Sequence, residues 1–137
     1  MTLPNEPDIT DRVPYTFKCD VSNIVDGDTV DVEIDLGFDI NATRTVRLRD
    51  IDTSVIHFVE NSSEEYREGI EHRNSLIDWV IHTQRVSDER FPFVLYSEEY
   101  NTGSYGRIIG DIWSPVTEEW ASRMQYDAYD TVELYED

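Results

Sequence analysis

Three short segments carry side chains that together could bind a divalent cation beside a phosphate group. Asp26–Thr29 places two acids on a tight turn just before an alternating apolar run. Arg47–Thr53 ends another such run, with an arginine five residues ahead of Asp52. Gly103–Arg107 adds a second arginine at the entrance of a further strand-like run. Two carboxylates and two guanidinium groups gathered by folding are suited to phosphoryl transfer.

Each segment taken alone is typical of ordinary structure. Asp-Gly is common hairpin-turn chemistry, and charged residues on an exposed strand face are usually solvated. The glycines of Gly103–Arg107 could serve only a loop that needs positive φ. The chemical interpretation therefore depends on the three segments meeting in the folded chain.

Alternating apolar residues predict the strands that would position these side chains. Three strands joined by short turns are expected at residues 15–25, 29–36 and 44–51. Asp26-Gly27 is the turn signal between the first two strands, and residues 37–43 form a polar loop. In the third strand Arg47 falls on the face opposite Val46 and Leu48.

A helix is expected over residues 63–82, beginning at a capping box made by Ser62 and Glu65. Its apolar residues fall near one helical face: Tyr66, Ile70, Leu76, Ile77, Val80 and Ile81. Two further strands are expected at residues 91–96 and 106–113. Ser114-Pro115 then predicts the start of a second helix that runs to about residue 126.

This order predicts an α+β, mainly β fold. It is the plan of a five-stranded OB-fold barrel with a helix between strands 3 and 4 and a second helix after strand 5. We expect an extended N-terminal arm at residues 1–14, the folded domain at residues 15–129 and an acidic tail at residues 130–137.

Charge is the unusual part of the composition. Thirty Asp and Glu face ten Arg and the single Lys18, a formal net charge of −19. Such self-repulsion destabilises a compact chain, but molar salt shortens the screening length to about 3 Å. The composition therefore favours the salt-rich cytoplasm of a haloarchaeon, or a virus of one. The alternative is an acidic protein that mimics or repels nucleic acid.

Other features of the sequence limit where the protein could be located and which sites it could carry. No run of about 18 apolar residues is long enough for a membrane span, and residues 1–10 are polar, so no signal peptide is expected. The single Cys19 predicts a buried thiol and allows no disulfide framework. The three histidines, His57, His72 and His82, lack zinc-type spacing and are expected on the surface or on an ordinary helix face.

In combination the motifs resemble the thermonuclease (staphylococcal nuclease-like) family, especially its phage-type members. The resemblance spans residues 15–129 and includes the order of the elements. It rests on four segments: Val25–Val30, Asp35–Phe38, Val46–Thr53 and Tyr105–Ile112.

The resemblance implies calcium-dependent hydrolysis of phosphodiesters in DNA or RNA, with Mg²⁺ as the alternative cation. It implies that Asp28 and Asp52 are metal carboxylates and that Thr53 supplies a backbone carbonyl to the metal. By the same resemblance, Arg47 and Arg107 hold the reacting phosphate, and Tyr105 lies near the nucleotide phosphate. These roles suit the chemistry, because calcium takes oxygen ligands and a guanidinium fork matches phosphate oxygens.

One position departs from the family pattern. Family sites follow the Asp-Thr pair with Pro-Glu, and that glutamate acts as general base or positions the attacking water. Here the pair is Ser54-Val55, and valine can do neither. General acid–base catalysis typically contributes about 10²–10⁴-fold. Four nearby side chains could substitute, and the sequence does not select among them: His57, Glu60, Glu64 and Glu65.

Two functions from different classes follow. The first is a weakened metal-dependent nuclease whose partner is nucleic acid, held through the local arginine and metal site because the chain has no basic footprint overall. The second is an inactive nuclease-like module in a larger assembly such as a haloarchaeal virion, where other virion proteins contact the arm and the tail. No membrane partner is expected.

Overall fold

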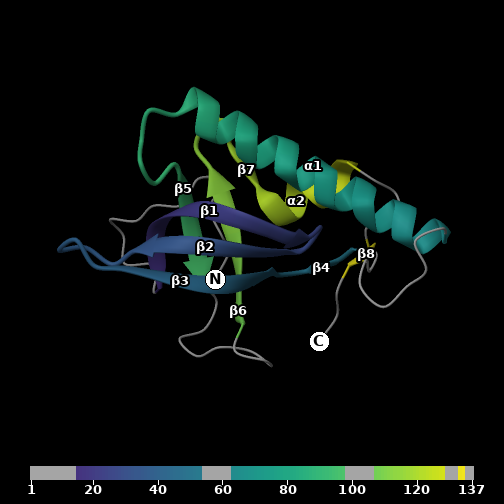
Figure 1. The fold of residues 1–137 in the computed structure, drawn as a ribbon, viewed down its shortest axis with the longest axis horizontal. Coiled ribbons are helices and arrows are strands. Elements are labelled where there is room, and N and C mark those ends of the chain that lie inside the picture. Colours follow the sequence, from purple (N-terminus) through teal and green to yellow (C-terminus); the bar gives the residue numbers. More distant parts are fainter. Residues whose placement is uncertain (1–14, 54–62, 98–106, 129–132, 135–137) are drawn as a thin grey trace.

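The computed structural model describes residues 15–53, 63–97, 107–128 and 133–134. Five long strands form its centre (Figure 1): β1 (Thr16–Asp26), β2 (Thr29–Asp35), β3 (Asn41–Leu48), β5 (Phe93–Ser97) and β6 (Ile108–Ser114). They are ordered β3-β2-β1-β5-β6, and a parallel pairing of β3 with β6 closes the sheet into a barrel. The predicted α+β, OB-fold-like architecture is confirmed. The N-terminal arm predicted at residues 1–14 lies outside the described residues.

The barrel forms because alternate residues of its strands are apolar and point inward. Val30, Val32 and Ile34 of β2 are buried, and the polar residues between them are half-buried on the outer face. Cys19 of β1 is fully buried in the same core, as predicted. Desolvation there raises the pKa of its thiol.

The strand predicted over residues 44–51 begins earlier and is broken before its end. β3 starts at Asn41 and stops at Leu48, and a turn at Arg49-Asp50 leads into the two-residue strand β4 (Ile51–Asp52). Asp50 adopts a left-handed conformation with φ 65° in this turn. β4 pairs with β8 (Glu133–Leu134), so part of the predicted acidic tail is a strand.

Helix α1 (Glu64–Val86) runs across one side of the barrel (Figure 1). Its N-cap is Ser63, whose side chain accepts a hydrogen bond from the Tyr66 N–H at 3.0 Å. The predicted Ser62–Glu65 capping box is therefore wrong by one residue, and the helix extends four residues past His82. None of the described helices is long and apolar enough to cross a membrane.

The buried face of α1 also differs from the predicted face. The predicted Leu76 and Val80 are buried, but Ile81 is exposed. The buried residues of α1 are Gly69, His72, Leu76, Trp79, Val80 and Thr83. The predicted face held Tyr66 and five aliphatic residues, whereas the buried face also includes a histidine, a tryptophan and a threonine.

The second helix is present, but its start at Ser114-Pro115 was predicted too early. β6 ends at Ser114, a turn follows, and β7 (Glu119–Trp120) pairs back on β6 before α2 (Ala121–Ala128) begins. The Ser114 hydroxyl accepts a hydrogen bond from the Thr117 N–H at 3.2 Å, and Glu118 takes a left-handed φ of 56°. This side-chain-supported turn competes with helix formation.

Candidate functional site

The turn after β3 brings Asp52 back beside Arg47. The Arg47 guanidinium donates through Nη1 to the carbonyls of Leu48, at 2.7 Å, and Ile51, at 2.8 Å. Its Nη2 lies 3.3 Å from Asp52 Oδ1. The spacing of five residues between Arg47 and Asp52 thus becomes a direct ion pair across a tight turn.

The first turn of the barrel supplies the second carboxylate. Asp28 is buried at the junction of β1 and β2, and its Oδ2 lies 3.4 Å from Arg47 Nη2. β2 pairs with β3 so that Thr29 faces Arg47, which sets this approach. Two carboxylates, Asp28 from the β1–β2 turn and Asp52 from β4, therefore converge on one guanidinium nitrogen.

Asp28 is held by a dense set of donors. Its Oδ2 accepts from the Thr53 N–H at 3.0 Å, and its Oδ1 accepts from the Thr29 hydroxyl at 2.9 Å. Burial alone would raise the pKa of Asp28. The hydrogen bond from Asp26, the Arg47 charge and the other donors outweigh burial and lower that pKa, so Asp28 is an anion at neutral pH.

Asp26 is the partner that carries the proton. Burial, a hydrogen bond to the Asp28 carboxylate and the negative charge of Asp28 raise the pKa of Asp26 to about 7. Its Oδ1 also accepts from the Asp28 N–H at 3.1 Å. The two carboxyl groups titrate as a pair that keeps one proton to near neutrality, as expected when like charges share a site.

Gly27 lets the acidic turn pack tightly against the rest of the molecule. A Cβ there would lie 2.6 Å from the Cβ of His72 and 2.9 Å from the Thr53 hydroxyl oxygen. The buried side chain of Gln125, on α2, donates to the carbonyls of Gly27, at 2.6 Å, and His72, at 2.8 Å. The turn is thereby fixed against both helices.

His72 and Gln125 are site-supporting residues that the sequence interpretation missed. His72 was expected on an ordinary helix face, but it is fully buried behind the acidic turn. Burial lowers the pKa of His72, against the opposing charges of Glu68, Glu71 and Asp28. Its four-residue spacing from Leu76 could have placed it on the packed face, whereas Gln125 carries no local signal.

The second predicted arginine, Arg107, lies at the entrance of the neighbouring strand β6. β3 pairs in parallel with β6, so that Arg47 is in register with Ile109. Arg107 is half-buried and lies immediately before β6, two residues before Ile109. Tyr105 and Val55 lie outside the described residues, as do His57 and Glu60. Glu64 and Glu65 are exposed in the first turn of α1.

The oxygen atoms at this site suit a hard divalent cation. Two carboxylates are the ligand type that calcium prefers, and in this structure the Arg47 guanidinium occupies the point on which Asp28 and Asp52 converge. The buried Thr53 hydroxyl beside them has no hydrogen-bond partner in the structure. Over the described ranges, no group of three or more His, Cys, Asp or Glu side chains could hold a metal ion. Backbone or water oxygens would complete the coordination.

Arg49, two residues after Arg47, belongs to a separate cluster of contacts around Asp111. Its Nε lies 3.3 Å from Asp111 Oδ2, and its guanidinium stacks 5.3 Å from the Tyr96 ring and 5.4 Å from the Trp120 ring. Asp111 is fully buried and accepts from the Ser122 N–H in the first turn of α2. Burial raises the pKa of Asp111 to about 6 despite these partners. These contacts join the turn after β3 to β6 and α2, so the role of Arg49 is to hold these elements together.

Comparison with known proteins does not identify the chain. No protein-family model matches it, and a search of curated proteins finds no significantly similar sequence. The likeness to thermonucleases therefore rests on the motifs in the sequence, and the function is argued from the site.

Proposed function

We propose that this protein is a metal-dependent phosphodiesterase of the staphylococcal nuclease type, acting on DNA or RNA and weakened at its general-base position. The observation that supports this proposal is the convergence of Asp28 and Asp52 on Arg47, which joins two distant motifs at one end of the barrel. The proposal includes a host with a salt-rich cytoplasm, because the chain carries a net charge of −19.

In this proposal Asp28, Asp52 and the Thr53 carbonyl hold a calcium ion, with magnesium as the alternative. A bound cation would offset charge that grows on the phosphate in the transition state. Arg47 is anchored through Nη1 on two backbone carbonyls, and its Nη2 lies between Asp28 and Asp52. A phosphate oxygen would accept from Nη2 in place of these carboxylates once they hold a cation. Arg107 would contact the same phosphate from the adjacent strand, and Tyr105 would lie near the nucleotide.

A second candidate is an inactive nuclease-like module that binds without cleaving. Two observations favour it. Val55 stands where the family carries its glutamate. Both terminal nitrogens of Arg47 already contact groups of the protein, backbone carbonyls through Nη1 and two carboxylates through Nη2. Such a module would serve a larger assembly such as a virion, where other proteins contact the arm and the tail.

The test is cleavage of labelled single- and double-stranded DNA and of RNA, in molar KCl with calcium and then magnesium. We expect slow cleavage that Arg47→Ala abolishes and Val55→Glu raises by at least about tenfold. Arg44→Ala is the matched control, because Arg44 is an exposed arginine of the same strand whose side chain donates to the Thr43 carbonyl. Arg47→Lys keeps the charge but loses the fork geometry.

The remaining outcomes separate the two candidates. A silent parent with activity gained in Val55→Glu would identify a disabled site on an intact scaffold and favour the second candidate. Silence of both proteins would overturn the assignment of the acids and arginines. Calorimetric titration with calcium provides a readout independent of cleavage, and Asp52→Asn should weaken it without unfolding the protein, because the Asp52 side chain is 53% exposed.

A further inference from the structure

The side-chain amide of Gln125 joins the acidic turn between β1 and β2 to helix α1. Gln125 lies on α2 and is fully buried. Its Nε2 donates to the Gly27 carbonyl of the turn at 2.6 Å and to the His72 carbonyl of α1 at 2.8 Å. A single nitrogen of α2 therefore holds two carbonyls that belong to two other elements.

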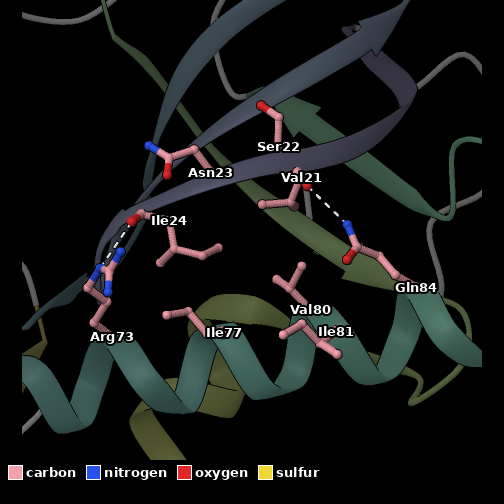
Figure 2. Close-up of a pocket in the computed structure, with 9 residues that line it drawn as sticks. All are labelled: Val21, Ser22, Asn23, Ile24, Arg73, Ile77, Val80, Ile81 and Gln84. Carbon is pink, nitrogen blue, oxygen red and sulfur yellow. Dashed lines mark hydrogen bonds between the residues drawn. The ribbon is translucent and has the colours of Figure 1, made fainter.

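Helix α1 is itself attached to the barrel, so the His72 carbonyl is a fixed point. Arg73, the next residue of α1, donates through Nε to the Ile24 carbonyl of β1 at 3.1 Å. Gln84 donates to the Val21 carbonyl of β1 at 3.0 Å. Figure 2 shows these two contacts at the ends of the hollow between β1 and α1. Through Gln125 the acidic turn is thus fixed relative to the barrel as well as to α2.

Gln125 acts on one particular peptide group, the one that joins Gly27 to Asp28. The carbonyl of this group accepts from Gln125, and its N–H donates to Asp26 Oδ1 at 3.1 Å. A peptide group is planar, so hydrogen bonds at both of its ends fix its orientation. That orientation sets the direction in which Asp28 projects its carboxylate, which accepts from the Thr53 N–H at 3.0 Å.

The acidic turn does not have the conformation that its hairpin favours. Asp26 pairs with Thr29, so the connection between β1 and β2 has two residues. The favoured two-residue turns, types I′ and II′, need a left-handed φ at the first of them. Gly27 could adopt such an angle readily, yet its φ lies outside the left-handed region. Contacts from the rest of the molecule therefore hold the turn in a less favoured form.

The carboxamide of Gln125 supplies this contact at a cost. Its Oε1 is buried and has no hydrogen-bond partner among the described residues. An unsatisfied buried polar atom is unfavourable. An apolar side chain of similar size would avoid this cost, but it could not donate to the two carbonyls. The donor is therefore the part of Gln125 that the fold uses.

We propose that Gln125 is a positioning residue of the cation site: by holding the Gly27–Asp28 peptide, it keeps the Asp28 carboxylate in place to bind the ion. The inference rests on the proposed function for its cation, whereas the effect of Gln125 on the turn does not. Without the donor, the turn relaxes toward a form with a left-handed Gly27, which moves Asp28 away from Thr53. Replacing residues that orient metal ligands typically weakens metal binding by about 10–100-fold.

Two variants of α2 separate positioning from a general loosening of the helix. Gln125→Met has a side chain of similar length without a hydrogen-bond donor. Ser122→Ala is the matched control, because it also removes a buried hydrogen bond of α2, but one whose partner is Asp111 in β6. In calorimetric titration with calcium in molar KCl, we expect Gln125→Met to bind at least about tenfold more weakly than the parent. Ser122→Ala should bind as the parent does.

Hydrogen exchange of the metal-free protein, followed by NMR, measures the same role without a cation. The Thr53 N–H donates to Asp28 and therefore reports displacement of that carboxylate. Its protection relative to the Val32 N–H of β2 should fall by about fivefold to tenfold in Gln125→Met, as expected for the loss of one hydrogen bond. The same ratio should not change in Ser122→Ala.

The parent protein provides a third measurement, which decides the matter should Gln125→Met fail to fold. The side-chain amide of Gln125 and the Thr53 N–H should exchange with the same opening free energy and the same dependence on urea, because one opening event frees both. Exchange of the two groups with different opening free energies would refute the proposal.

The outcomes distinguish this proposal from the proposed function. Equal loss of calcium affinity in Gln125→Met and Ser122→Ala would refute positioning, because the stability of α2 would then govern the site. An unchanged Thr53 protection ratio in Gln125→Met would refute it as well. A parent that binds no calcium but shows the expected exchange pattern would instead overturn the proposed function, and the hold of Gln125 on the turn would stand.

Discussion

Replacing Asp26 by asparagine should stabilise the protein at neutral and alkaline pH. The folded state holds a proton on Asp26 up to a pKa of about 7, whereas an ordinary aspartate loses it near 3.8. Between these values the folded chain binds more protons than the unfolded chain, so its stability falls as the pH rises. Asparagine mimics the protonated acid: its amide oxygen can accept from the Asp28 N–H and its amide group can donate to the Asp28 carboxylate.

The size of the effect follows from the pKa difference. At about 1.4 kcal/mol per pH unit, the interval from 3.8 to about 7 corresponds to about 4 kcal/mol. Asp26 is only half-buried, and solvent screening reduces this figure to about 2 kcal/mol. The advantage of Asp26→Asn should therefore be near zero at pH 3.5, grow between pH 4 and 7 and level off above pH 7.

The measurement is urea denaturation followed by tryptophan fluorescence, in metal-free buffer at constant molar KCl across this pH range. Asp78→Asn controls for the loss of one negative charge, because Asp78 is exposed on α1. A stability difference for Asp26→Asn that does not change with pH would refute the shared proton. So would a variant less stable than the parent at pH 8.

Three further predictions concern packing and charge. Gly27→Ala should lower the free energy of unfolding by about 1–3 kcal/mol, because its Cβ would meet His72 and Thr53. Denaturation of Gly37→Ala gives the cost of backbone strain without a clash, because φ is +83° there and the added Cβ meets nothing within 4 Å. Ser122→Ala should cost about 1–3 kcal/mol in the same assay, since it removes a hydroxyl donor from the buried Asp111. The melting temperature should rise from low to molar KCl, and no rise would contradict adaptation to high salt.

Local patterns predicted the parts of the fold that depend on burial of one strand face. The alternation of Val30, Val32 and Ile34 defines β2, because a shift of one residue would expose all three. The turn at Ser114 escaped prediction because it depends on a hydroxyl-to-backbone hydrogen bond and on a left-handed Glu118, neither of which periodicity detects.

The candidate site likewise has residues that local patterns predicted and residues that they did not. Asp28, Arg47 and Asp52 stand out in the sequence because each ends or follows a strand beside a turn. The residues that support them do not: the Gln125 side chain reaches the Gly27 carbonyl across 98 residues of sequence. Such a contact depends on how α2 packs against the barrel, and no local spacing encodes it. The proton on Asp26 likewise arises only when folding buries both acids together.

The acidic surface limits how this site can recognise a polyanion. Ordinary nucleic-acid binding gains affinity when a basic surface releases condensed counterions, which makes it steeply dependent on salt. A chain with a net charge of −19 offers no such surface, so on the proposed function only Arg47, Arg107 and a bound cation neutralise phosphate charge. Two arginine contacts to a single strand correspond to a slope of about −1.4 in log affinity against log salt. A slope several times steeper, measured by fluorescence anisotropy at fixed calcium, would place binding outside this site.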